Sequence, residues 1–153
     1  MTLLSASERR TLLDSALAAQ QCAYAVYSQF PVGAAILDAH GRLFAGANVE
    51  NASYGLAICA ERVAASLAVT AQPSAGQKPS AQITTDPFPW RAIAVASRGG
   101  VTPCGACRQF LIEFAPDMEV FLIDSTNHAV RQLSTLRELL PAAFESNTHL
   151  RKG

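Results

Sequence analysis

The length, composition and charge of the chain limit what it can be. Half of its 153 residues are hydrophobic, enough for one domain with a sizeable core and too few for two ordinary domains. Its 12 basic residues balance its 12 acidic ones, so we expect no nucleic-acid or membrane partner. The chain begins without a signal-peptide pattern and no apolar run reaches the length of a membrane span, which predicts a cytoplasmic location.

The first third of the chain is predicted to form a helix and a β-hairpin. Ser5 and Glu8 have the spacing of a capping box, and apolar residues follow at helical intervals, which predicts a helix over residues 5–20. Two apolar runs, at 31–38 and 41–49, are joined by turn residues. They predict a hairpin whose strands are buried on both faces.

The rest of the chain alternates helices and strands around one irregular stretch. The expected elements, in order, are a helix from about Leu56 that ends before Pro73, a proline-rich loop over 72–90, a strand at 91–97, a helix at 104–114, a strand at 119–124, a weaker strand at 130–133, a short helix at 136–144 broken at Pro141, and a flexible tail at 145–153. A strand, a helix and a strand in succession predict a parallel crossover. Since there is no internal repeat, we predict a single α/β domain over residues 1–153.

Three cysteines are predicted to form a metal site. Cys104 and Cys107 lie one helical turn apart at the start of a predicted helix, so their thiols can point the same way. Cys59 would also lie near a helix start, where free amides and the helix dipole stabilise thiolates. Three thiolates leave the fourth tetrahedral position of a zinc ion open to water, which is typical of catalytic zinc. The sequence therefore predicts one catalytic zinc ion per chain.

Two charged residues follow Cys59. Glu61 lies on a different side of the helix from that ligand, so it is poorly placed to bind the ion but could reach the ion's water. We expect Glu61 to act as the general acid and base that takes a proton from this water and passes it to a substrate nitrogen. Arg62 could donate to the sulfurs and offset the charge of three thiolates. Alternatively, Glu61 could be a solvated helix carboxylate and Arg62 a surface charge.

The residues alone leave other interpretations of the cysteines open. The C-x-x-C spacing of Cys104 and Cys107 also occurs in thioredoxin-type redox pairs, although that interpretation gives Cys59 and Glu61 no role. A structural zinc site would need a fourth ligand, for which Cys22 is a candidate. We expect Cys22 instead to be a thiol packed at the end of the first helix.

Two separated motifs carry a resemblance to a known family. CAE at 59–61, followed at a distance by PCGAC at 103–107, resembles the signature of the cytidine deaminases, the small cysteine-only branch of the zinc-dependent nucleoside deaminases. The similarity includes YSQFPVGAAI, GANVENASYGL, AIAVAS and ELLPAAF, and so covers nearly all of residues 24–144. The spacer at 72–90 is longer and richer in proline than is usual in the family. The resemblance implies a three-layer α/β/α sandwich with a mixed five-stranded sheet, which deaminates cytidine and 2′-deoxycytidine to uridine and 2′-deoxyuridine with release of ammonia.

The resemblance also implies roles for residues outside the metal motif. Asn48 and Glu50 match the family's ribose-binding pair, and the Asn-Val-Glu alternation places both side chains on one face. Phe30 matches an aromatic residue that packs on the pyrimidine, and the main chain around Ala60 and Cys104 is expected to bind the polar edge of the base. These residue types suit a substrate with an aromatic face, a polar edge and sugar hydroxyls. Asn48 and Glu50 could otherwise shape a turn, and Phe30 could be core.

The resemblance further implies an assembly. Tyr54 and Phe144 match residues that complete a neighbouring subunit's pocket in tetrameric members of the family, which implies a homotetramer with shared active sites and a place in pyrimidine salvage. Phe144 could otherwise be a core residue. Two other functions stay open: a deaminase for another substrate, such as a nucleoside antibiotic or a base within RNA, and a non-catalytic zinc-stabilised interaction module. The balanced charge argues against RNA, and the NVENASYG motif favours a free nucleoside.

Overall fold

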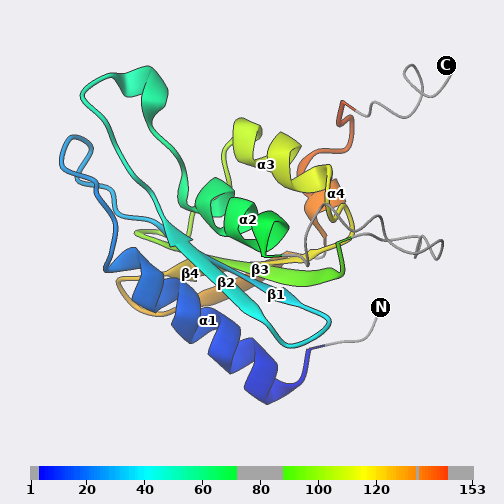
Figure 1. The fold of residues 1–153 in the computed structure, drawn as a ribbon. Coiled ribbons are helices and arrows are strands. Elements are labelled where there is room, and N and C mark those ends of the chain that lie inside the picture. The colour runs from blue at the N-terminus through cyan, green and yellow to red at the C-terminus, as the bar shows by residue number, and fades with distance from the viewer. Residues whose placement is uncertain (1–3, 72–87, 134, 145–153) are drawn as a thin grey trace, which may run out of the picture.

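The structure is a computed structural model that describes residues 4–71, 88–133 and 135–144 (Figure 1). Most of the loop predicted at 72–90 and the whole tail predicted at 145–153 lie outside the described residues. The described residues form a central sheet with helices on both of its faces. No helix among them is long and apolar enough to cross a bilayer.

A mixed five-stranded sheet forms the centre, as predicted. Its strands are β1 at Gly33–Asp38, β2 at Leu43–Ala47, β3 at Trp90–Ser97, β4 at Glu119–Asp124 and β5 at Val130–Leu133. They lie in the order β2-β1-β3-β4-β5, in which β3 and β4 are parallel and every other neighbouring pair is antiparallel. A helix joins the two parallel strands, so the predicted crossover is confirmed.

Helices cover both faces of the sheet and give three layers. α1, Ala6–Gln20, lies along one face against β1, β2 and β3. The other face carries α2 at Ala60–Thr70, α3 at Gly105–Ile112 and the short α4 at Leu136–Leu139 (Figure 1). A single 3-10 turn, η1 at Tyr54–Leu56, precedes α2. The predicted three-layer α/β/α sandwich is confirmed.

The first helix begins with the capping box that its sequence predicts. The Ser5 hydroxyl accepts a hydrogen bond from the Glu8 amide at 3.2 Å, and Glu8 Oε2 accepts one from the Ser5 amide at 2.8 Å. These two bonds satisfy amides that a helix start otherwise leaves without partners, and an N-cap of this kind contributes about 1 kcal/mol. Further along α1, Leu12 and Ala16 are fully buried against the sheet.

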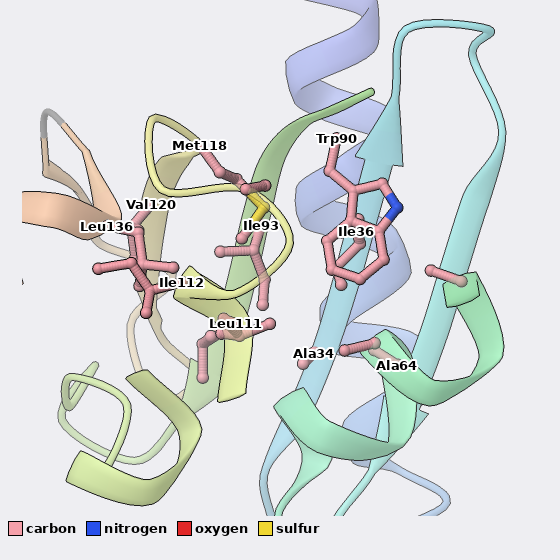
Figure 2. Close-up of a cluster of buried hydrophobic side chains, with 14 of the residues drawn as sticks. Ala34, Ile36, Ala64, Trp90, Ile93, Leu111, Ile112, Met118, Val120 and Leu136 are labelled. Atoms are coloured by element: carbon pink, nitrogen blue, oxygen red, sulfur yellow. The ribbon is translucent and has the colours of Figure 1, made fainter. Parts of the chain in front are cut away.

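Separate hydrophobic clusters fill the two spaces between sheet and helices. The cluster under α2 and α3 is the larger and includes Ile36, Ile93 and Leu111 (Figure 2). Trp90 also belongs to it, with its ring centroid 5.3 Å from that of Phe114, and is 4% exposed. Trp90 therefore opens β3 and does not belong to the loop, which corrects the predicted end of that loop.

Two glycines let helices approach the β1–β2 hairpin closely. A Cβ atom at Gly33 would lie 2.2 Å from the carbonyl oxygen of Ala16 in α1, and one at Gly46 would lie 2.7 Å from the amide nitrogen of Ala64 in α2. Any larger residue at either position would force a helix away from the sheet. The contact at Gly46 thus sets the position of α2, whose first residues contribute to the candidate site.

Several predicted boundaries are wrong for physical reasons. The strand predicted at 41–49 is shorter and only partly buried, because β2 is an edge strand of the sheet. The helix predicted from about Leu56 begins at Ala60, after the 3-10 turn. The helix predicted at 136–144 ends at Leu139, since Pro141 disfavours helical geometry just before it.

Candidate metal centre and substrate site

Two of the three predicted ligands are the N-cap residues of helices. Cys59 precedes α2 with φ −73° and ψ 151°, and Cys104 precedes α3 with φ −65° and ψ 164°. Ser5, the N-cap of α1, has nearly the same geometry at φ −64° and ψ 159°. Neither thiol caps its helix with a hydrogen bond. Both side chains can therefore turn to a common centre, which the positive ends of two helices face.

The three predicted cysteines form one cluster. The Sγ atoms of Cys59, Cys104 and Cys107 all lie within 4.8 Å of one another, and those of Cys59 and Cys104 are 4.0 Å apart. A tetrahedral zinc ion with zinc–sulfur distances of about 2.3 Å holds its sulfurs about 3.8 Å apart. Cys107 is buried and Cys104 is exposed, so the cluster opens to solvent on the Cys104 side. The donor set fits a zinc ion with one open position.

Cys22 takes no part in this cluster. It is exposed at the end of α1, so the prediction of a packed thiol is wrong. Because Cys22 lies outside the cluster, the cysteines of this chain do not form the four-thiol structural zinc site considered above. The convergence of Cys59 on Cys104 and Cys107 also argues against a simple two-cysteine redox pair.

Hydrogen bonding moves the pKa values of Cys59 and Cys107 apart. A hydrogen bond from Cys107 lowers the pKa of Cys59 to about 5 against the opposing effect of burial, and contacts with Cys104 and Arg62 lower it further. The same hydrogen bond and burial raise the pKa of Cys107. Of these two thiols, Cys59 is therefore the one that ionises more readily.

Arg62 is the cation beside these thiols. Burial lowers its pKa, but contacts with Cys59 and Cys107 outweigh that effect and raise the pKa overall. Its Nη2 donates to the carbonyl oxygen of Ala57 at 3.5 Å. Its Nε is buried without a hydrogen-bond partner within the described part of the chain. A buried N–H donor that lacks a protein acceptor and lies next to a thiol cluster is suited to donate to the sulfurs when they hold a metal ion.

Glu61 lies in the first turn of α2, beside the cluster but outside it. The residue is 4% exposed, and it is not one of the residues whose ligand atoms group together. Burial and the charge of Cys59 raise the pKa of Glu61, although hydrogen bonds from its own amide and from Cys107 oppose the rise. A buried carboxyl group next to a metal cluster, and not within it, is a typical arrangement for a general acid or base.

Asn48 and Glu50 both turn toward the segment that follows α1, as their alternation predicts. Asn48 Oδ1 accepts a hydrogen bond from the Val32 amide at 2.8 Å, and Nδ2 donates to the Phe30 carbonyl oxygen at 3.0 Å. Glu50 Oε2 accepts from the Tyr27 amide at 2.8 Å. Hydrogen bonds from Ser28 and from the Tyr27 amide hold the pKa of Glu50 below its usual value, despite some burial. Both side chains thus shape this segment.

An open cleft of about 330 Å³ lies in front of Glu50. Its lining residues come from the segments after α1 and before α2: Tyr27, Ser28, Glu50, Asn51, Tyr54 and Ala57. One of these lining residues, Ala57, stands two positions before Cys59 in the sequence. The Glu50 carboxylate and the segment that leads to Cys59 thus share the wall of this cleft.

The aromatic residues predicted for the site have different surroundings. Tyr54 is 78% exposed at the rim of the cleft, with its ring edge-on to Tyr27 at 5.9 Å. Phe30 is partly buried and does not line the cleft, and the Arg98 guanidinium lies 5.5 Å from its ring centroid. Phe144 is 75% exposed beyond α4, so the alternative that it is a core residue is wrong. Ala60 is fully buried as the first residue of α2.

Comparison with known proteins identifies the family. Residues 6–123 match the family model described as the cytidine and deoxycytidylate deaminase zinc-binding region. The chain belongs to this deaminase family. A cytidine deaminase from Halalkalibacterium halodurans is 40% identical over 90% of the chain and 94% of its own length. A crystal structure of cytidine deaminase from Burkholderia pseudomallei matches with 43% identity and a TM-score of 0.75, covering 88% of this chain and 98% of that one. The resemblance predicted from the sequence is confirmed.

A more distant relative of this deaminase has a different named activity. A blasticidin-S deaminase from Bacillus cereus is 33% identical over 76% of the chain and 78% of its own length. Family membership alone therefore leaves room for more than one substrate, which has to be argued from the residues around the cleft.

Some site residues of this deaminase were missed at the level of sequence. Tyr27, Ser28 and Asn51 line the cleft, although only their place within the family-like motifs could have drawn attention to them. Arg108 and Gln109 directly follow the metal motif and bind main-chain atoms of the C-terminal segment. A main-chain acceptor leaves no mark in the sequence, so spacing and composition could not reveal these contacts.

Proposed function

We propose that this protein catalyses the hydrolytic deamination of cytidine and 2′-deoxycytidine to uridine and 2′-deoxyuridine, with release of ammonia. The observation that carries the proposal is the cluster of Cys59, Cys104 and Cys107 at two helix starts with the buried carboxyl group of Glu61 beside it. Three thiols can hold a metal with one position left open, and a nearby carboxyl group can move protons.

The chain's part in the metal chemistry is to supply three thiolates. Cys59, Cys104 and Cys107 would hold one zinc ion, and Arg62 would balance the excess negative charge with its unpaired Nε. When bound, the ion supplies a Lewis acid that makes water available as a nucleophile near neutral pH.

Glu61 is proposed to carry the protons. Its carboxylate takes one proton from the attacking water and delivers it to the ring nitrogen next to the reacting carbon, then takes the second proton from the newly attached hydroxyl group and delivers it to the departing amine. Burial of Glu61 supports this role, because a carboxyl group held away from solvent exchanges protons with its bound partners and not with bulk water. The hydrolysis balances as one water and one cytidine giving one uridine and one ammonia.

The substrate's sugar and base are proposed to bind along the cleft. Glu50 is proposed to accept a ribose hydroxyl with its carboxylate, whose Oε2 also accepts the amides of Tyr27 and Ser28. Asn48 already uses one donor and one acceptor on the main chain around Phe30, so its remaining N–H is proposed to contact the sugar. These main-chain bonds also support a role for Phe30, because they fix the backbone that carries its ring toward the pyrimidine.

The polar edge of the base is proposed to bind main-chain groups at the two helix starts. The first amides of a helix have no partner within it, so those near Ala60 and Cys104 can donate to a ligand. This arrangement would recognise cytosine through directed hydrogen bonds close to the open metal position.

We also propose that the active unit is a homotetramer with shared sites. Large apolar side chains are exposed together on the segments after α1 and around η1, among them Tyr24, Val26, Tyr27, Tyr54 and Leu56. These segments project beyond the end of the sheet in Figure 1. Exposed apolar surface of this kind is typical of an interface. Light scattering at assay concentration should give about four times the 16.2 kDa of one chain, and an active monomer would contradict the assembly.

The cellular setting follows from the same chemistry. All four cysteines are free thiols, which supports a reducing compartment such as the cytoplasm. A deaminase of free nucleosides converts a cytosine base to a uracil base and so serves pyrimidine salvage.

A second candidate activity is deamination of a cytosine-containing nucleoside antibiotic. The relation to blasticidin-S deaminase favours including it, since the metal chemistry would be the same. Because Glu50 and Asn48 are proposed to bind the sugar of cytidine, we expect them to affect the choice between the two substrates.

Ammonia release by the purified protein tests the proposal. The panel contains cytidine, 2′-deoxycytidine, cytosine, adenosine, guanosine and blasticidin S. We expect cytidine and 2′-deoxycytidine to be good substrates and all others to be far poorer. Preferred turnover of blasticidin S would support the second candidate, and zinc binding without turnover of any member would indicate a non-catalytic zinc module.

A further inference from the structure

Residue 108 donates a hydrogen bond to each of the two peptide units that flank the ligand Cys104, one from the Arg108 side chain and one from its main chain, as in any helix. Its Nε donates to the carbonyl oxygen of Pro103 at 2.7 Å, and its main-chain amide donates to the carbonyl oxygen of Cys104 at 3.0 Å. Pro103 is buried, so its carbonyl group needs a protein donor. The amide of Cys104 lies in the same peptide plane as the Pro103 carbonyl group. Arg108 therefore fixes the direction of this amide and the position from which the Cys104 thiol extends.

The same guanidinium group reaches two more acceptors. Nη2 donates to Thr102 Oγ1 at 2.9 Å, and Nη1 donates to the carbonyl oxygen of Leu139 at 3.1 Å. Thr102 belongs to the loop before Cys104, whereas Leu139 is the last residue of α4. One planar group with donors in a fixed fork thus joins the metal loop to the C-terminal segment, which a lysine could not do at three points.

The next residue of α3 holds the end of that segment. Gln109 Nε2 donates to the Phe144 carbonyl oxygen at 2.9 Å, and Gln109 Oε1 accepts from the Phe144 amide at 3.0 Å. Arg108 and Gln109 together fix the described chain from Leu139 to Phe144 on α3, which carries Cys107 and follows its N-cap Cys104. Hydrogen bonds from Arg108 and Gln109 therefore link the loop before Cys104 to the C-terminal segment.

We propose that Arg108 is a positioning residue of the metal centre, which orients the Pro103–Cys104 peptide and ties it to the C-terminal segment. The side chain of Arg108 bonds to Pro103, Leu139 and Thr102, so it would act on the metal centre through Cys104. The inference rests on the proposed zinc centre and adds a residue outside the metal motif and the substrate cleft. Groups that orient a metal ligand commonly change metal affinity by about ten- to a hundredfold when they are removed.

Zinc affinity, measured by competition with a chelator, tests the proposal. Arg108→Ala should bind zinc about ten- to a hundredfold more weakly than the wild type, and Arg108→Lys should show a smaller loss because it can restore one of the hydrogen bonds. Arg137→Ala is the matched control, since Arg137 in nearby α4 makes an exposed ion pair with Asp117 at 3.4 Å. Its zinc affinity should equal that of the wild type. The thermal stability of each metal-free variant is measured alongside.

The outcomes separate positioning from general stability. Wild-type zinc affinity in Arg108→Ala, with lowered stability of the metal-free protein, would overturn the proposal and leave Arg108 a structural residue. If Arg108→Ala does not fold, Arg108→Lys decides, and wild-type affinity in that variant would overturn the proposal. Failure of the wild type itself to bind zinc would count against the proposed function, and is visible in the same titration.

Discussion

The start of α1 and the starts of α2 and α3 share one backbone geometry but use it differently. Ser5 caps α1 with its hydroxyl, whereas Cys59 and Cys104 adopt nearly the same φ and ψ and make no cap. A missing N-cap costs a helix about 0.5–2 kcal/mol. This cost falls at the two places where the thiols converge. The starts of α2 and α3 therefore lack the stability of a cap and present metal ligands instead, as functional sites commonly do.

The largest expected effect is on zinc content, which should depend on Cys104 in the thiol cluster and not on Cys22 outside it. Cys104→Ala should lose the zinc ion and with it all measurable ammonia release, because two thiols do not hold zinc at a site built for three. Cys22→Ala should keep both, since Cys22 is exposed and outside the cluster. Elemental analysis of the purified variants checks this. An undiminished zinc content of Cys104→Ala would show that the N-cap of α3 is not a metal ligand, and so would contradict the proposed difference from the N-cap of α1.

A smaller effect is expected for Glu50. Its carboxylate could only stabilise the fold, as Ser5 does, or it could also bind the substrate. A charge-assisted hydrogen bond to a ribose hydroxyl contributes about 1.5–3 kcal/mol, so Glu50→Ala should lower the cytidine-to-cytosine ratio of kcat/KM by about ten- to a hundredfold. Glu50→Gln can still accept the Tyr27 amide and controls for loss of the loop contact. An unchanged ratio in Glu50→Ala would assign Glu50 to the fold alone.

The contrast between caps can be tested directly in the metal-free protein. Cys104→Ser places a hydroxyl group where Ser5 has one, in almost the same backbone geometry. Because the hydroxyl can cap α3, the metal-free variant should be more stable than the metal-free wild type by about 0.5–1 kcal/mol, while zinc binding is impaired. Urea denaturation of both proteins after chelation measures the difference. Equal or lower stability of the variant would show that the cysteine start has no capping deficit.

The smallest expected effect is a loss of folding stability at acidic pH. Hydrogen bonds from the amide and hydroxyl of Ser5 and then from Arg91 lower the pKa of Glu8 to about 2, from its ordinary value of 4.5. A lowered folded-state pKa means that this contribution to stability is fully present above about pH 4.5 and is lost as the pH falls toward 2. The stability difference between wild type and Glu8→Gln should therefore shrink across that range. A difference that stays constant with pH in urea denaturation would contradict the role of Glu8.

Local patterns predicted the fold well and its partly exposed elements poorly. The capping box of Ser5 and Glu8 and the apolar runs of β1, β3 and β4 were enough, because each depends on neighbours in the sequence. The strand at 41–49 looked fully buried from its composition, but its place at the sheet edge depends on the sheet order. The sequence places Trp90 at the end of a loop, because its burial depends on a contact with Phe114 from a distant part of the chain.

The metal cluster was predictable because chemistry restricts it. Three thiols and one adjacent carboxyl group have few joint uses, so Cys59, Cys104 and Cys107 could be grouped before any geometry was known. Arg108 could not be predicted in the same way, since its partners are main-chain carbonyl groups that any sequence supplies. Cys22 was misjudged because burial of a single thiol depends on packing that the sequence does not display.

The central claim is that three thiolates hold a zinc ion and that Glu61 moves the protons. Glu61→Gln keeps the size of the side chain and removes its proton exchange, and Glu113→Gln makes the same change on the surface at the end of α3. Zinc content and the rate of ammonia release from cytidine are measured for both variants and the wild type. We expect about one zinc per chain in all three proteins, with turnover lower by about two to four orders of magnitude in Glu61→Gln alone. Near-normal turnover in zinc-loaded Glu61→Gln would contradict the account.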